Sequence, residues 1–147
     1  MPVGFIHELV VACLVHNECN DVLLVKHHRR GWEIPVGRVE NGEALLNAVK
    51  REVTEESGIN ILVHNPVAFH SKVDDKPALV VVFVGESLGG KLRTSDETVE
   101  VGWFKPADAF KLVEHPASKD RIRDALSYNG TVIHRSYTIS PYHSQII

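Results

Sequence analysis

The feature that most constrains the fold is an unbroken apolar run at residues 78–84, ALVVVFV. A strand with one face in water alternates apolar and polar residues, whereas a strand covered on both faces is apolar throughout. The run therefore predicts a central strand over 79–84 with a layer of helices on each side of its sheet. It is far too short to cross a bilayer, which takes roughly 20 apolar residues.

Further strands are predicted where apolar and β-branched residues gather. The stretches 9–15 and 22–25 flank the turn-forming segment 17–21, which indicates an early hairpin. We also expect a short strand or loop at 34–37 and strands at 61–63 and 98–104. Substrate choice is expected to lie in loops between these strands, such as 66–77 and 86–96.

One long helix is predicted over residues 43–57, which contain no glycine or proline. Leu46, Val49 and Val53 recur at intervals of three and four, so they form one apolar stripe that can pack on a sheet. Gly58 would end this helix. Two more helices are expected, a short one that begins at Pro106 and a second over 118–126.

The same helix carries three glutamates on one side. Glu52, Glu55 and Glu56 stand at i, i+3 and i+4, where like charges repel and the negative end of the helix dipole is close. Arg51 can reach Glu55, but one arginine cannot neutralise three carboxylates. A hard divalent cation, Mg²⁺ or Mn²⁺, would complete the balance, and this chemistry suits phosphoryl or diphosphoryl hydrolysis.

The segment 37–59, GRVENGEALLNAVKREVTEESGI, resembles the Nudix box of the MutT-like Nudix hydrolases, G-x5-E-x7-R-E-U-x-E-E-x-G-U with U a bulky aliphatic residue. The resemblance implies an α/β fold, a Nudix-type α/β/α sandwich with a mixed β-sheet and the box as a loop, helix and loop. One domain would span residues 1–147. Every specified position of the box is matched, by Gly37, Glu43, Arg51, Glu52, Val53, Glu55, Glu56, Gly58 and Ile59.

The resemblance also assigns roles to the residues of the box. Glu52, Glu55 and Glu56 would bind Mg²⁺, with Mn²⁺ as a substitute, and Glu52 and Arg51 would belong to the catalytic centre. Glu43, placed early in the helix, and Arg51 would orient the ligand carboxylates. Two glycines would support the motif, Gly37 by permitting a tight loop into the helix and Gly58 by ending it.

A second acidic residue is expected on a loop before a late tryptophan strand, where many members of the family use it as metal ligand or general base. Glu97, six residues before Trp103, is the candidate, with Asp96 and Glu100 as competitors. The base could equally be one of the helix glutamates. One departure from the family is Val36, which stands where a glycine is common and resists positive φ.

The resemblance implies hydrolysis of the diphosphate linkage in a nucleoside diphosphate joined to another moiety, by water attack on phosphorus. A small nucleotide-like diphosphate is the expected partner, since a net charge of −3 does not attract a long nucleic acid. The N-terminal stretch MPVGFIHELV lacks a basic leader, so a cytoplasmic protein without membrane attachment is expected.

Two other functions fit the same box. A non-catalytic nucleotide-binding module would have lost a box glutamate, and here all are present. An isomerase of prenyl diphosphates would aim a cysteine, Cys13 or Cys19, into the pocket. The tail 129–147 could add a strand, cover the site or pack on a second subunit in a homodimer.

Basic and aromatic residues outside the box have less specific interpretations. Residues 27–30, HHRR, are read as a basic surface turn, although Arg29 or Arg38 could face a phosphate. Trp32 and Trp103 are expected in the core, because large aromatics beside apolar strands are usually buried.

Overall fold

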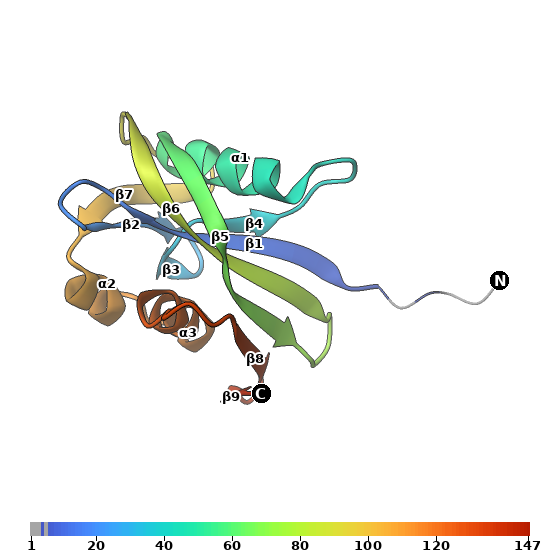
Figure 1. Ribbon diagram of the computed structural model, residues 1–147. Helices are drawn as coiled ribbons and strands as arrows, with labels where there is room; N and C mark the ends of the chain where they lie inside the picture. The colour runs from blue at the N-terminus through green and yellow to red at the C-terminus, as the bar shows by residue number, and fades with distance from the viewer. Residues whose placement is uncertain (1–3, 5) are drawn as a thin grey trace.

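The computed structural model describes residues 4 and 6–147, and it consists of one sheet between two layers of helices (Figure 1). Helix α1 (Leu45–Ser57) covers one face, and α2 (Pro106–Leu112) and α3 (Pro116–Leu126) cover the other. The α/β/α sandwich is therefore confirmed. Residues 1–3 and 5, part of the stretch that suggested the absence of a leader, lie outside the described residues.

The sheet is mixed and contains nine strands in the described part of the chain. Its main order is β3-β2-β1-β6-β5-β8-β9, while β4 pairs with β1 and β7 pairs with β2. The β1–β6 and β5–β8 pairs are parallel, and the other pairs are antiparallel. The strands are β1 (Glu8–His16), β2 (Val22–His27), β3 (Gly31–Glu33), β4 (Val36–Arg38), β5 (Ile59–Lys72), β6 (Ala78–Gly90), β7 (Thr98–Phe104), β8 (Ile133–Thr138) and β9 (His143–Ile146).

Strand β6 is buried on both faces, as its sequence predicted. Val81 and Phe83 belong to the core under α1, while Val80 and Val82 belong to the core under α2 and α3. Strand β1 divides in the same way, because successive side chains of a strand point to opposite faces. Together β1 and β6 hold the two cores in a fixed relation to each other.

Strands β5 and β6 are much longer than expected. They take up most of the segment 66–77 and the first part of 86–96, both of which were predicted to be loops. The apolar pattern that marked the strand centres is interrupted at these ends, by His70, Ser71 and Lys72 in β5 and by Glu86, Ser87, Gly89 and Gly90 in β6. The β5–β6 pair has a register shift at Asn60/Ile61 and two more, at Val63/Pro66 and Pro66/Ala68, that accommodate Pro66, which has no N–H to donate.

Helix α1 begins later than predicted. Glu43 precedes it, in a turn where its backbone N–H donates to the Glu40 carbonyl. Leu46 also differs from the expectation, since 48% of it is exposed, and Ala48 joins Val49 and Val53 on the buried side instead. Leu45, one position before Leu46, packs partly buried against the same core, so the stripe is formed by Leu45, Ala48, Val49 and Val53.

The tail beyond residue 129 adds two strands to the sheet. Strand β8 pairs in parallel with β5, and β9 forms the outer edge of the sheet. Among the described residues, no helix has the length and apolar character needed to cross a membrane.

Candidate active site

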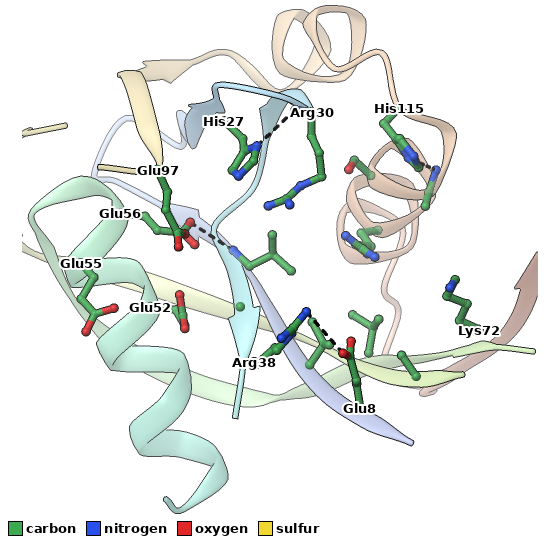
Figure 2. A pocket seen from close by; sticks show the side chains of 18 of the residues that line it. Glu8, His27, Arg30, Arg38, Glu52, Glu55, Glu56, Lys72, Glu97 and His115 are labelled. Carbon is green, nitrogen blue, oxygen red and sulfur yellow. Dashed lines mark hydrogen bonds and ion pairs between the residues drawn. The ribbon is translucent and has the colours of Figure 1, made fainter. Parts of the chain in front are cut away.

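A cleft of about 980 Å³ opens between α1, β4 and α3 (Figure 2). One end is acidic and contains Glu52, Glu55 and Glu56 from α1 together with Asp96 and Glu97 from the segment before β7. The predicted cluster of carboxylates therefore faces a single cavity. The helix glutamates come together because they lie three and four residues apart on one side of α1.

Arg51 connects most of the acidic residues of the box. Its Nε and one terminal nitrogen donate to the two Glu43 oxygens at 2.6 and 2.9 Å. The other terminal nitrogen donates to Glu52 at 2.7 Å and to Glu55 at 3.2 Å. Hydrogen bonds from Arg51, followed by one from the backbone of Glu40, lower the pKa of Glu43 to about 2. Glu43 thus anchors the guanidinium although it lies outside the helix.

Glu56 is the most deeply buried of the helix glutamates, with 4% of its surface exposed. Burial, and then the negative charges of Glu52 and Glu33, raise the pKa of Glu56 to about 9. Burial also raises the pKa of Glu52, against the effect of Arg51. The side chain of Glu55, in contrast, is 59% exposed. The acidic end therefore holds more negative charge than its one arginine balances.

Gly37 serves the site differently from the prediction. It does not enter a tight loop but lies within β4, opposite Val11 of β1. A Cβ atom at this position would lie 2.0 Å from the Glu52 carboxyl carbon. Only glycine therefore leaves room for the Glu52 carboxylate against the strand.

Val36 fits its position without strain. It pairs with Ala12 in the sheet, and its backbone N–H donates to Glu56 at 3.3 Å. Positive φ angles in the described chain occur at Asn20, Lys76 and several glycines, and Val36 is not among them. The departure from the usual glycine therefore costs this chain no backbone strain.

Glu97 is directed toward Glu56 in Figure 2, from a segment that is fastened to α1. The Thr98 hydroxyl donates to the Glu56 carbonyl at 2.9 Å, and Thr98 is almost fully buried. The same hydroxyl accepts the backbone N–H of Ser95 at 3.1 Å. Of the two competitors, Asp96 also lines the cleft, whereas Glu100 points away and pairs with Lys26 on β2.

Gly58 ends α1 in the predicted manner, with a φ of 83° and its N–H donating to the Thr54 carbonyl. The segment that follows β6 also passes very close, since a Cβ here would lie 2.2 Å from the Lys91 carbonyl oxygen. Two independent constraints therefore require glycine at this position.

The comparisons with known proteins agree with this geometry. The model of the NUDIX domain family matches residues 6–126. The chain belongs to the Nudix family. A MutT-like protein of Streptomyces ambofaciens is 33% identical over 85% of this chain and 80% of its own length. A Nudix hydrolase structure from Nitrosomonas europaea has a TM-score of 0.80 at 20% identity, covering 93% of this chain and 82% of that one.

Another Nudix relative is the 8-oxo-dGDP phosphatase NUDT18 of Danio rerio. It is 30% identical over 72% of this chain, but the match covers 34% of its own length. The chain thus spans about a third of the length of this relative.

Several residues of the Nudix cleft differ from their predicted roles or were not predicted at all. Residues 28–30 form an exposed turn, as predicted, but His27 is buried at the end of β2. His27 and Arg30 also line the cleft, and Arg30 donates two hydrogen bonds to the buried Glu33. Arg38 lines the cleft as well, paired with Glu8 at 3.3 Å. Many of the unpredicted residues come from the region of α3 and from the tail: His115, Ala117, Ser118, Arg121, Tyr137 and Ile139.

These residues escaped the sequence analysis because no motif connects them with the Nudix box. The tail was assigned three alternative roles, and the structure confirms two of them together. It adds strands to the sheet, and through Tyr137 and Ile139 it lines the cleft.

Neither cysteine fits the isomerase alternative. Cys13 is buried in the core beneath the Nudix helix, and burial raises the pKa of its thiol far above the usual range. Cys19 is exposed in the turn after β1. Both lie outside the set of described residues that line the cleft. The two tryptophans are partly buried against the two cores, as predicted.

The acidic end fits a divalent cation by its chemistry. Its donors are all oxygens, and the raised pKa values of Glu52 and Glu56 show that their carboxylate forms lack a counter-charge, which a hard cation supplies. Within the described chain, no three acidic, histidine or cysteine side chains are close enough to form a ready-made metal site. Arg51 holds oxygens of both Glu52 and Glu55, and therefore occupies part of the space between these carboxylates.

Proposed function

We propose that this chain is a metal-dependent hydrolase that cleaves the diphosphate linkage of a nucleoside diphosphate joined to another group, by water attack on phosphorus. The observation that carries the proposal is the grouping of Glu52, Glu55 and Glu56 beside one arginine, facing a cleft large enough for a nucleotide. Burial disfavours the ionised forms of Glu52 and Glu56, so a bound cation would be needed to hold both as carboxylates.

Glu52, Glu55 and Glu56 would hold Mg²⁺, with Mn²⁺ as a substitute. The bound cations would offset charge on the diphosphate oxygens and help to acidify the attacking water. Because Mg²⁺ usually retains phosphate and water ligands, a few carboxylates from the chain are enough. Arg51, anchored by Glu43, would orient Glu52 and Glu55, while Gly37 and Gly58 keep space for the Glu52 carboxylate and for the chain after the helix.

Glu97 is the candidate general base. Its loop is tied to the backbone of Glu56 through Thr98, so its carboxylate stays beside the metal-binding residues, and a carboxylate within reach of a bound water can remove its proton. The charges of Glu56 and Glu97 also contribute, after the hydrogen bond to Glu33, to the raised pKa of Arg30. Both carboxylates thus act on the same part of the cleft.

The tail 129–147 would belong to the same catalytic domain, because Tyr137 and Ile139 form part of the cleft wall. The name of the NUDT18 relative adds 8-oxo-dGDP to the candidate substrates. The nucleoside diphosphate derivative itself is left to experiment.

The test is a panel of nucleoside diphosphates including 8-oxo-dGDP, nucleoside triphosphates, dinucleoside polyphosphates and sugar nucleotides, incubated with Mg²⁺ or with EDTA. We expect hydrolysis in the presence of Mg²⁺ and none in the presence of EDTA. In water labelled with ¹⁸O, one phosphate product should carry the label. Glu97→Gln should lower turnover strongly, while Glu100→Gln, a matched change outside the cleft, should not. Inactivity across the whole panel with Mg²⁺ would overturn the proposal.

A further inference from the structure

The end of the cleft opposite the glutamates is cationic. Arg121 on α3 and Arg30 in the turn before β3 supply its positive charge, and His115 lies near both; we call these three residues the cationic end. Figure 2 shows Glu52, Glu55 and Glu56 on one side of the cleft and His115 on the other. A molecule that fills the cleft would therefore meet opposite charges at its two ends.

Arg121 differs from the other three arginines that line the cleft. Arg30 pairs with Glu33, Arg38 with Glu8, and Arg51 with Glu43. For Arg121, no carboxylate within the described chain lies at ion-pair distance. Its Nε is buried without a hydrogen-bond partner, and one terminal nitrogen lies 3.5 Å from the Tyr137 hydroxyl. A guanidinium has five N–H donors, so Arg121 keeps most of its binding capacity for a ligand.

The surroundings of Arg121 hold little that offsets its positive charge. Burial, and then the charge of Arg121, lower the pKa of His115, and Arg30 adds to this effect. The nearby carboxylate of Glu33 is already held by two hydrogen bonds from Arg30. Ser118, three residues before Arg121 and thus on the same face of α3, adds a hydroxyl to the cleft wall.

We propose that Arg121 binds an anionic group, a phosphate or carboxylate, that the substrate carries away from its scissile diphosphate. The inference rests on the proposed function, since it takes the diphosphate to lie at the acidic end. An anion satisfies the fork of N–H donors and balances the charge, whereas a neutral carbonyl satisfies the donors alone. The preferred substrates are therefore diphosphates with an additional negative group on the remote moiety.

Binding of matched ligand pairs tests this directly. NADH and NADPH differ by one ribose phosphate, as do dephospho-coenzyme A and coenzyme A, and all four contain a diphosphate. Calorimetric titration would be carried out with Ca²⁺ in place of Mg²⁺ to suppress turnover. We expect the phosphorylated member of at least one pair to bind about tenfold more tightly, or better.

Two variants connect that preference with Arg121. In Arg121→Gln the ratio of the two affinities should fall to near one. Arg29→Gln removes the same charge from an exposed residue outside the cleft and should keep the wild-type ratio. Thermal unfolding checks that both variants fold. If Arg121→Gln does not fold, it is replaced by Arg121→Lys, which keeps the charge but loses the fork and should show a reduced affinity ratio.

Equal affinities within both wild-type pairs, absence of binding by all four ligands, or a ratio that survives in Arg121→Gln would overturn the inference. Failure of the proposed function looks different. In that case the affinity ratio would depend on Arg121, while no member of the substrate panel would be hydrolysed with Mg²⁺.

Discussion

Helices α1 and α3 both bury carboxylates beside arginines, but their charge balance differs. On α1, Arg51 serves Glu43, Glu52 and Glu55 at once, and Glu56 accepts its hydrogen bond from a backbone N–H. On α3, Asp124 accepts two hydrogen bonds at 2.8 Å from Arg135 and one at 2.7 Å from His70. The second aspartate of α3, Asp120, is held by Arg123, Tyr142 and Ser144.

The comparison separates two uses of buried charged groups: stabilising the fold, on α3, and binding a ligand, on α1. The α3 network is matched, so it fastens β8 and β9 to the helix and adds to stability. The α1 network has more carboxylates than arginines, which disfavours ionisation of Glu56 in the absence of a ligand and favours cation binding. Isosteric substitutions in the two networks should therefore have opposite consequences.

The largest effect is expected from Asp124→Asn. It leaves the Arg135 guanidinium buried without its carboxylate, which should lower the free energy of unfolding by about 3 to 5 kcal/mol. Urea unfolding measures this, with the exposed carboxylate change Glu100→Gln as a control expected to remain near wild type. A loss below about 1 kcal/mol would show that the α3 network is not a matched one.

Glu56→Gln should have the opposite profile. Turnover should fall by at least about 100-fold, because a metal-binding charge is removed, while stability stays equal or rises. Steady-state kinetics with the best substrate of the panel and urea unfolding give the two values. Wild-type turnover in this variant would exclude Glu56 from the metal site. A large loss of stability would contradict the excess of carboxylates over arginines on α1.

Acid should weaken the α3 network in a defined range. Burial raises the pKa of Asp124, but hydrogen bonds from Arg135 and His70 outweigh it and hold the pKa at about 2, below the ordinary value of 3.8. The carboxylate therefore contributes about 2 kcal/mol of stability above pH 4, which is lost as the pH falls toward 2. The difference in unfolding free energy between wild type and Asp124→Asn should narrow over this range, and a constant difference would refute the assignment.

The smallest effect concerns the fastening of Glu97 to α1. Thr98→Val removes the hydrogen bond to the Glu56 carbonyl while nearly preserving shape, so we expect turnover to fall about tenfold. KM should change little, and Thr98→Ser should restore turnover because it keeps the hydroxyl. A change in KM alone, or no rescue by serine, would mean that Thr98 supports the fold without positioning Glu97.

Local patterns were sufficient for the parts of the molecule that lie close together in sequence. The unbroken apolar run of β6 correctly predicted burial on both faces, and the spacing of Glu52, Glu55 and Glu56 correctly placed them on one side of a helix. The boundaries were less accurate. Glu43 lies before α1 because its side chain is used to hold Arg51, and Leu46 is exposed because Ala48 takes the buried position.

Contacts between distant segments were beyond the sequence alone. The role of Gly37 depends on Glu52, which is fifteen positions further along the chain and comes to lie against β4. Patterns of neighbouring residues do not predict such a contact. The cationic end depends on α3 packing against β1, β5 and β6, which brings His115 and Arg121 to the same cleft as Arg30. The sequence by itself determined the acidic helix and the two-sided sheet, because helical and strand periods fix which neighbours share a face. Only the tertiary structure brought Arg121 into the same cleft without a carboxylate partner, because pairing across the fold depends on which distant side chains meet.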